Sequence, residues 1–133
     1  MRLLFLLPAL LLLTGCPLLA DPDEPCICTE EYRMIIVRVV DEAGAPVGGL
    51  RVTVRNERTG RLIEREEMGF DPGTYTVVTD LHVPVISEDG DRISFHAENE
   101  RYVADAEFVV RVDPCRCHID MVSGPNWIRA RPR

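Results

Sequence analysis

The sequence predicts an all-β fold, a single antiparallel β-sandwich of about seven strands. Short runs that are rich in β-branched residues recur at spacings near ten residues, with turn residues between them. Several of these runs alternate apolar and polar side chains, which is the pattern of strands with one buried face. No segment shows a convincing amphipathic helical period. Two packed sheets are the architecture that such a series of strands favours.

The chain begins with a segment that is typical of a secretory signal peptide. One arginine precedes an apolar run over residues 3–13, which is too short for a permanent membrane anchor. The run ends in the sequence LTGC, which resembles the lipobox of bacterial lipoproteins. This resemblance implies that residues 1–15 are removed and that Cys16 is acylated. The alternative is an ordinary signal peptide that is cut after Ala20.

An acylated cysteine would attach the protein to a membrane without a transmembrane helix. The chain contains no second apolar run of the length that a membrane-spanning helix needs. Pro17 stands where familiar lipoproteins carry the aspartate that signals retention at the inner membrane. The lipoprotein resemblance therefore implies a lipid-anchored protein of the cell envelope, at the outer membrane, on its periplasmic or surface face.

The composition narrows the choice of partners. A length of 133 residues suits a single domain, and the formal net charge is −7. This charge argues against nucleic acid and against an anionic membrane surface as binding partners.

The elements follow from the turn residues and the periodicity. Residues 16–31 are acidic and proline-rich without a strand or helix period, so we expect a tether there. Residues 50–57 alternate well, with Leu50, Val52 and Val54 on one face. We expect the sandwich over residues 32–125 and a basic tail over 126–133. The expected strands cover residues 33–40, 50–57, 61–66, 74–80, 92–98, 102–113 and 115–122.

The stretch VRVVDEAGAPVGGLRVTVRNERTGRLIE, followed by PGTYTVV, resembles the carboxypeptidase regulatory-like domain, a small transthyretin-like β-sandwich. The resemblance covers roughly residues 34–125 and implies a structural, adhesive or accessory module without a catalytic group or cofactor. The matching positions, which we call the signature residues, are Asp41, Gly44, Pro46, Gly73 and Tyr75.

Four cysteines besides Cys16 form two Cys-x-Cys pairs, Cys26 with Cys28 and Cys115 with Cys117. In an extended chain, residues two apart point to the same side. Because a secreted protein meets an oxidising compartment, we predict two disulfides that join one pair to the other. A ring within one pair would be strained, and the choice between the two remaining pairings is open. In transthyretin-like sandwiches the first strand lies beside a late one, so the resemblance implies that the two pairs meet at one end of a sheet.

The alternative for these cysteines is a metal site. Four thiolates from Cys26, Cys28, Cys115 and Cys117, with His118 as a spare ligand, would suit Zn²⁺ or Cu(I). Zinc sites usually have two or more residues between paired cysteines, however, and on a strand His118 would point away from Cys117.

The remaining candidates for chemistry are weaker. We expect His82 in a loop and His96 on a polar strand face to be solvated or locally bonded. Glu88, Asp89 and Asp91 offer oxygen ligands for calcium, but a hairpin turn explains the sequence SEDGD as well. No Gly-x-Ser-x-Gly or His-Glu-x-x-His motif occurs.

The basic tail carries Trp127, Arg129, Arg131 and Arg133. One interpretation is a segment that lies against the acidic domain, with Trp127 over a sheet edge. The other interpretation is a segment that docks to a partner.

Taken together, the sequence predicts a lipid-anchored envelope lipoprotein without catalytic activity or cofactor. It would act as a structural or protein-interaction module with a protein partner in the envelope. The alternatives are an envelope protein that binds zinc or copper through its cysteines, and a surface lipoprotein that binds carbohydrate or another partner.

Overall fold

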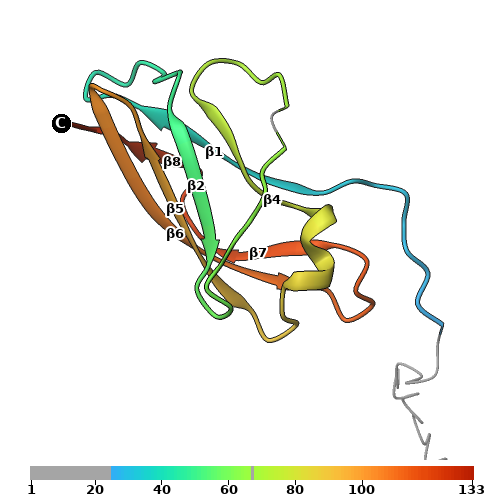
Figure 1. Cartoon of the computed structure of the whole chain (residues 1–133). Coiled ribbons are helices and arrows are strands. Elements are labelled where there is room, and N and C mark those ends of the chain that lie inside the picture. The colour runs from blue at the N-terminus through green and yellow to red at the C-terminus, as the bar shows by residue number, and fades with distance from the viewer. Residues whose placement is uncertain (1–24, 67) are drawn as a thin grey trace, which may run out of the picture.

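The structure is a computed structural model that describes residues 25–66 and 68–133 (Figure 1). The predicted signal peptide, the predicted acylation site Cys16 and residues 17–24 of the predicted tether lie outside the described residues. Within the described part of the chain, no helix has the length and apolar character needed to cross a membrane.

The predicted all-β sandwich is confirmed. One sheet has the strand order β4-β1-β8, and the other has the order β3-β2-β5-β6-β7, with β9 paired to β6. The first sheet consists of β4 (Thr74–Thr79), β1 (Met34–Val40) and β8 (Trp127–Arg129). The second consists of β3 (Arg61–Leu62), β2 (Arg51–Asn56), β5 (Asp91–Glu98), β6 (Tyr102–Val112), β7 (Ile119–Ser123) and β9 (Arg131–Pro132). A short 3₁₀ helix, η1 (Asp80–Val85), follows β4.

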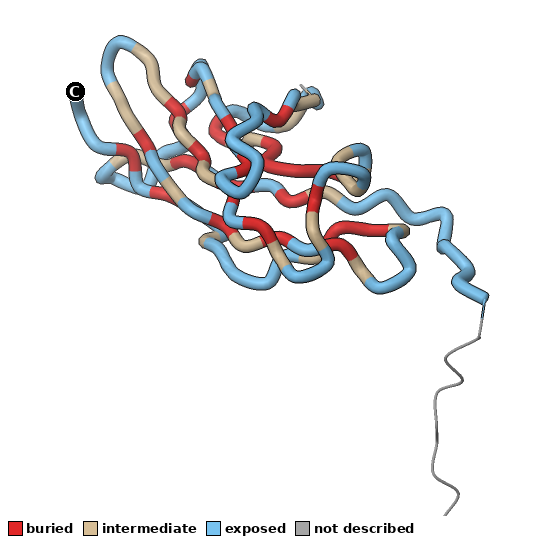
Figure 2. The backbone as a smooth tube through the Cα atoms, turned by 60° about the horizontal axis from the view of Figure 1, so that its bottom comes forward, coloured by how far each residue is buried: buried red, intermediate tan, exposed pale blue. Residues whose placement is uncertain are grey.

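The core lies between the two sheets and is built from alternating strand positions (Figure 2). In β5 every second residue is buried, so that Ile93, Phe95 and Ala97 face inward. Phe108 of β6 meets Phe95 edge to face, with 6.4 Å between the ring centroids. Val37 and Val39 of β1 complete the opposite wall. Burial of each such aliphatic or aromatic side chain contributes about 1.5–3 kcal/mol.

The C-terminal part differs from the sequence prediction in two ways. Residues 115–118, which we expected at the start of a strand, form a turn in which Arg116 has a φ of 54°, and β7 begins only at Ile119. Residues 126–133, which we expected outside the domain, form β8 and β9. Strand β8 pairs with β1 in parallel, so one ladder of the sandwich is not antiparallel. A strand of three residues is too short to show a period in the sequence.

The signature residues lie together at the end of the sandwich where β1 leads into β2. Asp41 Oδ1 accepts the N–H groups of Ala43 and Ala45, both at 2.9 Å, and so closes the turn. The hydroxyl of Tyr75 donates to the carbonyl of Val47 at 2.8 Å. The β1–β2 connection is thereby fixed to the start of β4.

Gly73 and Pro46 pack against each other at the same place. The N–H of Val39 donates to the carbonyl of Gly73 at 2.7 Å, and Val40 forms a β-bridge with Pro46. Gly73 has a φ of 84°, and a Cβ there would lie 2.7 Å from Cβ of Pro46. Only glycine fits this backbone conformation and this contact.

Candidate functional site

Two disulfides hold the N-terminal segment against the turn before β7. Cys26 is bonded to Cys115 and Cys28 to Cys117, each across 89 residues and with 5.4 Å between the Cα atoms. The prediction of two bridges between the pairs is confirmed. Of the two pairings that the sequence left open, the structure has the one in which the first cysteines of the two pairs are bonded to each other, and likewise the second cysteines. The chain enters the domain before β1 at one end of the molecule (Figure 1), and both bridges join this entering segment to the turn before β7.

In the structure this pairing leaves no free thiol at the four cysteines of the alternative metal site. A sulfur in a disulfide is not a thiolate and cannot serve as a metal ligand. Among the described residues, no group of three or more His, Cys, Asp or Glu side chains is placed to hold a metal ion. His118, the expected spare ligand, is used elsewhere.

His118 is 6 % exposed and connects three segments of the chain. Its Nδ1 donates to Asp80 Oδ2 at 2.7 Å, and its Nε2 lies 3.0 Å from Oγ1 of Thr29. Because a carboxylate only accepts, the Nδ1 proton is fixed, and a neutral ring then accepts the hydroxyl proton of Thr29. No motif in the sequence singles out Thr29 or Asp80, which lie 89 and 38 residues from His118.

Asp80 is the centre of this connection. Its carboxylate also accepts the N–H of Arg33 at 2.8 Å and the N–H of Ile119 at 2.9 Å. Burial by itself raises the pKa of Asp80, but the hydrogen bonds from Arg33, His118 and Ile119 outweigh it and lower the pKa below its ordinary value. Asp80 therefore stays ionised and joins η1 to the starts of β1 and β7.

The order Thr29, His118 and Asp80 is that of a hydroxyl, a base and a carboxylate in nucleophilic enzymes. Such a site also needs free N–H donors for an oxyanion. The neighbouring N–H groups of Cys117 and His118 donate to the carboxylate of Asp113, at 2.8 and 3.1 Å. These two donors are occupied, and the hydrogen bonds of Thr29, His118 and Asp80 connect three segments of the chain.

The remaining candidate residues from the sequence do not come together in one site. Asp91 is buried in β5 and bonded to Arg58, whereas Glu88 pairs with Arg116. These carboxylates do not share a calcium site. His96 lies on the exposed side of β5, with Nδ1 2.6 Å from Asp105 Oδ1.

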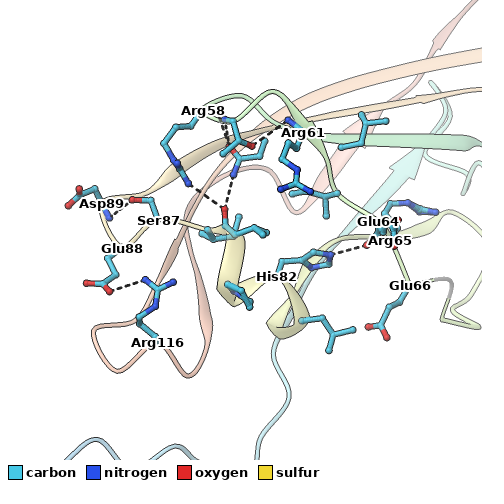
Figure 3. A pocket seen from close by; sticks show the side chains of 18 residues that line it. Arg58, Arg61, Glu64, Arg65, Glu66, His82, Ser87, Glu88, Asp89 and Arg116 are labelled. Carbon is cyan, nitrogen blue, oxygen red and sulfur yellow. Dashed lines mark hydrogen bonds and ion pairs between the residues drawn. The ribbon is translucent and has the colours of Figure 1, made fainter.

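A groove of about 1000 Å³ lies between β3, η1 and the loop before β5 (Figure 3). Its floor contains the buried side chains of Ile63 and Ile86. Two apolar side chains on its rim are open to solvent, Leu62 at 61 % and Leu81 at 63 % exposure. The charged side chains that line the groove are four arginines and four carboxylates, namely Arg58, Arg61, Arg65, Arg116, Glu64, Glu66, Glu88 and Asp89.

His82 belongs to η1, where we had expected a loop, and it forms a wall of the groove. Its Nδ1 accepts the N–H of Thr79 at 3.1 Å, and its Nε2 lies 2.8 Å from the carbonyl of Glu64 (Figure 3). The ring is therefore locally bonded, as the sequence suggested. It fixes the chain after β3 to the helix and so sets the width of the groove.

The opposite wall is held by a buried ion pair. Asp91 Oδ1 accepts from Nε of Arg58 at 2.5 Å, and Asp91 Oδ2 accepts from Asn56 at 2.6 Å and from the N–H of Ser87 at 3.2 Å. Burial raises the pKa of Asp91, but the hydrogen bonds from Arg58, Asn56 and Ser87 lower it by more, so the net pKa is below its ordinary value. This carboxylate is satisfied and is not free for a ligand.

β3 offers an open edge to the groove. It is the terminal strand of its sheet, and the N–H of Ile63 donates to Val54 of β2 at 2.9 Å. Because bonded residues alternate along an antiparallel strand, the N–H and C=O of Leu62 point away from β2. Arg61 forms no ion pair within the described part of the chain. The groove thus presents two backbone groups, an apolar floor and an uncompensated cation.

Comparison with protein-family models, with curated proteins and with solved structures found no match for this chain.

Proposed function

We propose that this protein is a non-catalytic, lipid-anchored envelope lipoprotein whose carboxypeptidase regulatory-like domain binds a partner protein. The observation that carries the proposal is the double disulfide between residues 26–28 and 115–117. Disulfides of this kind persist in oxidising compartments. They also join the segment that follows the predicted acylated cysteine directly to the domain.

The groove beside β3 is the proposed binding site for the partner. An extended segment of the partner would form hydrogen bonds with the free N–H and C=O of Leu62, as in strand addition to a sheet edge. An apolar side chain of that segment would lie over Ile63 and Ile86, and an acidic side chain would meet Arg61. The partner is therefore expected to offer an extended segment that is both apolar and acidic.

The anchoring is tested by metabolic labelling with an alkyne analogue of palmitate. We expect the wild-type protein to take up the label and to sediment with membranes, and Cys16→Ser to abolish both. A labelled Cys16→Ser variant, or an unlabelled wild-type protein, would contradict the anchoring.

The binding is tested by a photo-crosslinking amino acid at position 62 in living cells. We expect one discrete adduct, which disappears when Arg61→Glu is added, because the acidic segment then meets a like charge. The same amino acid at Glu107, an exposed position on β6, is the matched control and should give no such adduct. If position 62 gives no adduct beyond the control, the groove is not the binding site.

A further inference from the structure

The outer face of the sheet β4-β1-β8 carries an exposed cluster of apolar and basic side chains. We call it the β1–β8 face and define it by Ile36, Arg38, Trp127 and Arg129. Arg38 of β1 is opposite Trp127 of β8 in the ladder, so both side chains point outward. Trp127 is 55 % exposed and Ile36 is 42 % exposed, which is unusual for side chains of this kind.

Two hollows lie along the β1–β8 face. One hollow is lined by Ile36, Arg38, Thr74, Asn126 and Trp127. A second hollow shares Ile36 and Asn126 with the first and reaches the exposed Met121.

The two arginines of the face are uncompensated. Neither Arg38 nor Arg129 forms an ion pair in residues 25–66 and 68–133, and the guanidinium of Arg129 lies 5.8 Å from the ring centre of Trp127. The next arginines along the chain differ, because Arg131 pairs with Asp105 and Arg133 with Glu98. In a chain with a net charge of −7, this face is therefore locally basic.

We propose that the β1–β8 face lies on the phospholipid headgroup layer of the membrane to which the protein is anchored. Trp127 and Ile36 would enter the interfacial region, where tryptophan is favoured, and Arg38 and Arg129 would meet lipid phosphates. This proposal rests on the acylation of Cys16. From Cys16 to Cys26, which is fixed to the domain, ten residues span at most about 35 Å, which limits how far the domain can stand from the bilayer.

The net charge of the whole chain argued against an anionic surface as partner. The β1–β8 face differs from the chain as a whole, because its own charged side chains are two arginines. Repulsion between exposed charges is screened over about 8–10 Å at physiological ionic strength. A bilayer in contact with the β1–β8 face therefore meets Arg38 and Arg129 first, and more distant carboxylates contribute less.

The proposal is tested with the full-length lipidated protein in vesicles of phosphatidylcholine with one quarter phosphatidylglycerol. Trp127 is the only tryptophan of the chain, so its fluorescence reports on this face alone. We expect brominated lipids to lower its emission about two-fold relative to unbrominated vesicles. The double variant Arg38→Glu and Arg129→Glu should lose most of this quenching.

The matched control makes the same charge change elsewhere, as Arg55→Glu with Arg111→Glu, and should keep the quenching. Circular dichroism checks that all variants remain folded. Flotation of the vesicles reports on the anchor separately. Protein that floats with unquenched Trp127 overturns this proposal and leaves the anchor intact. Protein that fails to float overturns the anchor on which the proposal rests. A shift of Trp127 emission that depends on protein concentration without vesicles assigns the face to a second copy of the chain, and also overturns the proposal.

Discussion

At the scale of single residues, Gly73 and Gly44 illustrate two different reasons why a position requires glycine. Both have a φ near 84°, where an L side chain is strained, but only Gly73 touches other atoms where a Cβ would stand. A Cβ at Gly73 would lie 2.7 Å from Pro46, whereas Gly44 has nothing within 4 Å. The same substitution at both positions therefore separates the cost of backbone strain from the cost of a steric clash.

We expect Gly44→Ala to lower the free energy of unfolding by about 1–2 kcal/mol, because of the backbone strain alone. Gly73→Ala should cost about 1–3 kcal/mol more, because the new methyl group is forced against Pro46. Urea denaturation with the disulfides intact measures both losses. Equal losses would mean that the contact between Gly73 and Pro46 is relaxed at no cost.

The buried carboxylate of Asp91 makes stability depend on pH. Its pKa is lowered in the folded protein, so its contribution is present above the unfolded pKa of about 4 and is lost as the pH falls through the folded value. We expect Asp91→Asn to lower the free energy of unfolding at pH 7 by about 1.5–3 kcal/mol. Its stability should then fall less steeply than that of the wild type between about pH 4 and pH 2.

Urea denaturation at a series of pH values measures this dependence. Asp89→Asn is the control, since the carboxylate of Asp89 has no ion pair within the described residues. If the free energy of unfolding of Asp91→Asn falls in parallel with that of the wild type down to pH 2, Asp91 is not the cause of the acid sensitivity. Asp80, which is held in the same way, would then be the group to examine.

At the scale of elements, β8 shows how a short segment becomes part of the core. Its middle residue Ile128 and the following Ala130 are buried, and the N–H of Ala130 donates to the carbonyl of Val40 at 2.7 Å. The N–H of Arg38 donates to Asn126 at 3.1 Å on the same ladder. β8 thus protects the edge of β1 that β4 leaves open.

We expect a chain that ends at Gly124 to be strongly destabilised. Loss of the buried Ile128 alone costs about 1.5–3 kcal/mol, and the lost ladder bonds and the newly open edge of β1 add to it. A chain that ends at Ala130 keeps β8 and removes only exposed residues, so it should lose less than about 1 kcal/mol. Thermal unfolding of the two truncated proteins compares these losses. A stable chain ending at Gly124 would instead favour the tail as a segment for docking alone.

At the scale of the whole molecule, the two disulfides act on the same loop. Each closes 89 residues of sequence separation, so either one alone removes nearly all the chain entropy that the pair removes. The second bridge instead prevents rotation of residues 25–28 about the first. The domain is thereby held in one orientation relative to residues 25–28.

We therefore expect strongly non-additive effects of the bridges. Cys26→Ser with Cys115→Ser, or Cys28→Ser with Cys117→Ser, should lower the free energy of unfolding by less than about 1.5 kcal/mol. Removal of all four cysteines should cost about 4–5 kcal/mol. Chemical denaturation of the three variants provides the measurement. If the losses of the two double variants are equal and sum to the loss of the fourfold variant, the bridges stabilise by local packing and not through the unfolded chain.

The sequence by itself determined the all-β sandwich, because alternation in stretches such as residues 92–98 depends only on which face of a strand is buried. It also determined that the two cysteine pairs form two bridges, since a bridge within one pair is strained. Only the tertiary structure decided which cysteine meets which, because the two pairings differ in register and not in residue type.

The same holds for the hydrogen-bonded group of Thr29, His118 and Asp80 and for the buried pair of Arg58 and Asp91, which depend on contacts between segments far apart in the chain. The groove beside β3 and the basic β1–β8 face follow from the order of the strands in the two sheets. Periodicity fixes which side of each strand is buried, but only the packed sheets determine which exposed sides become neighbours.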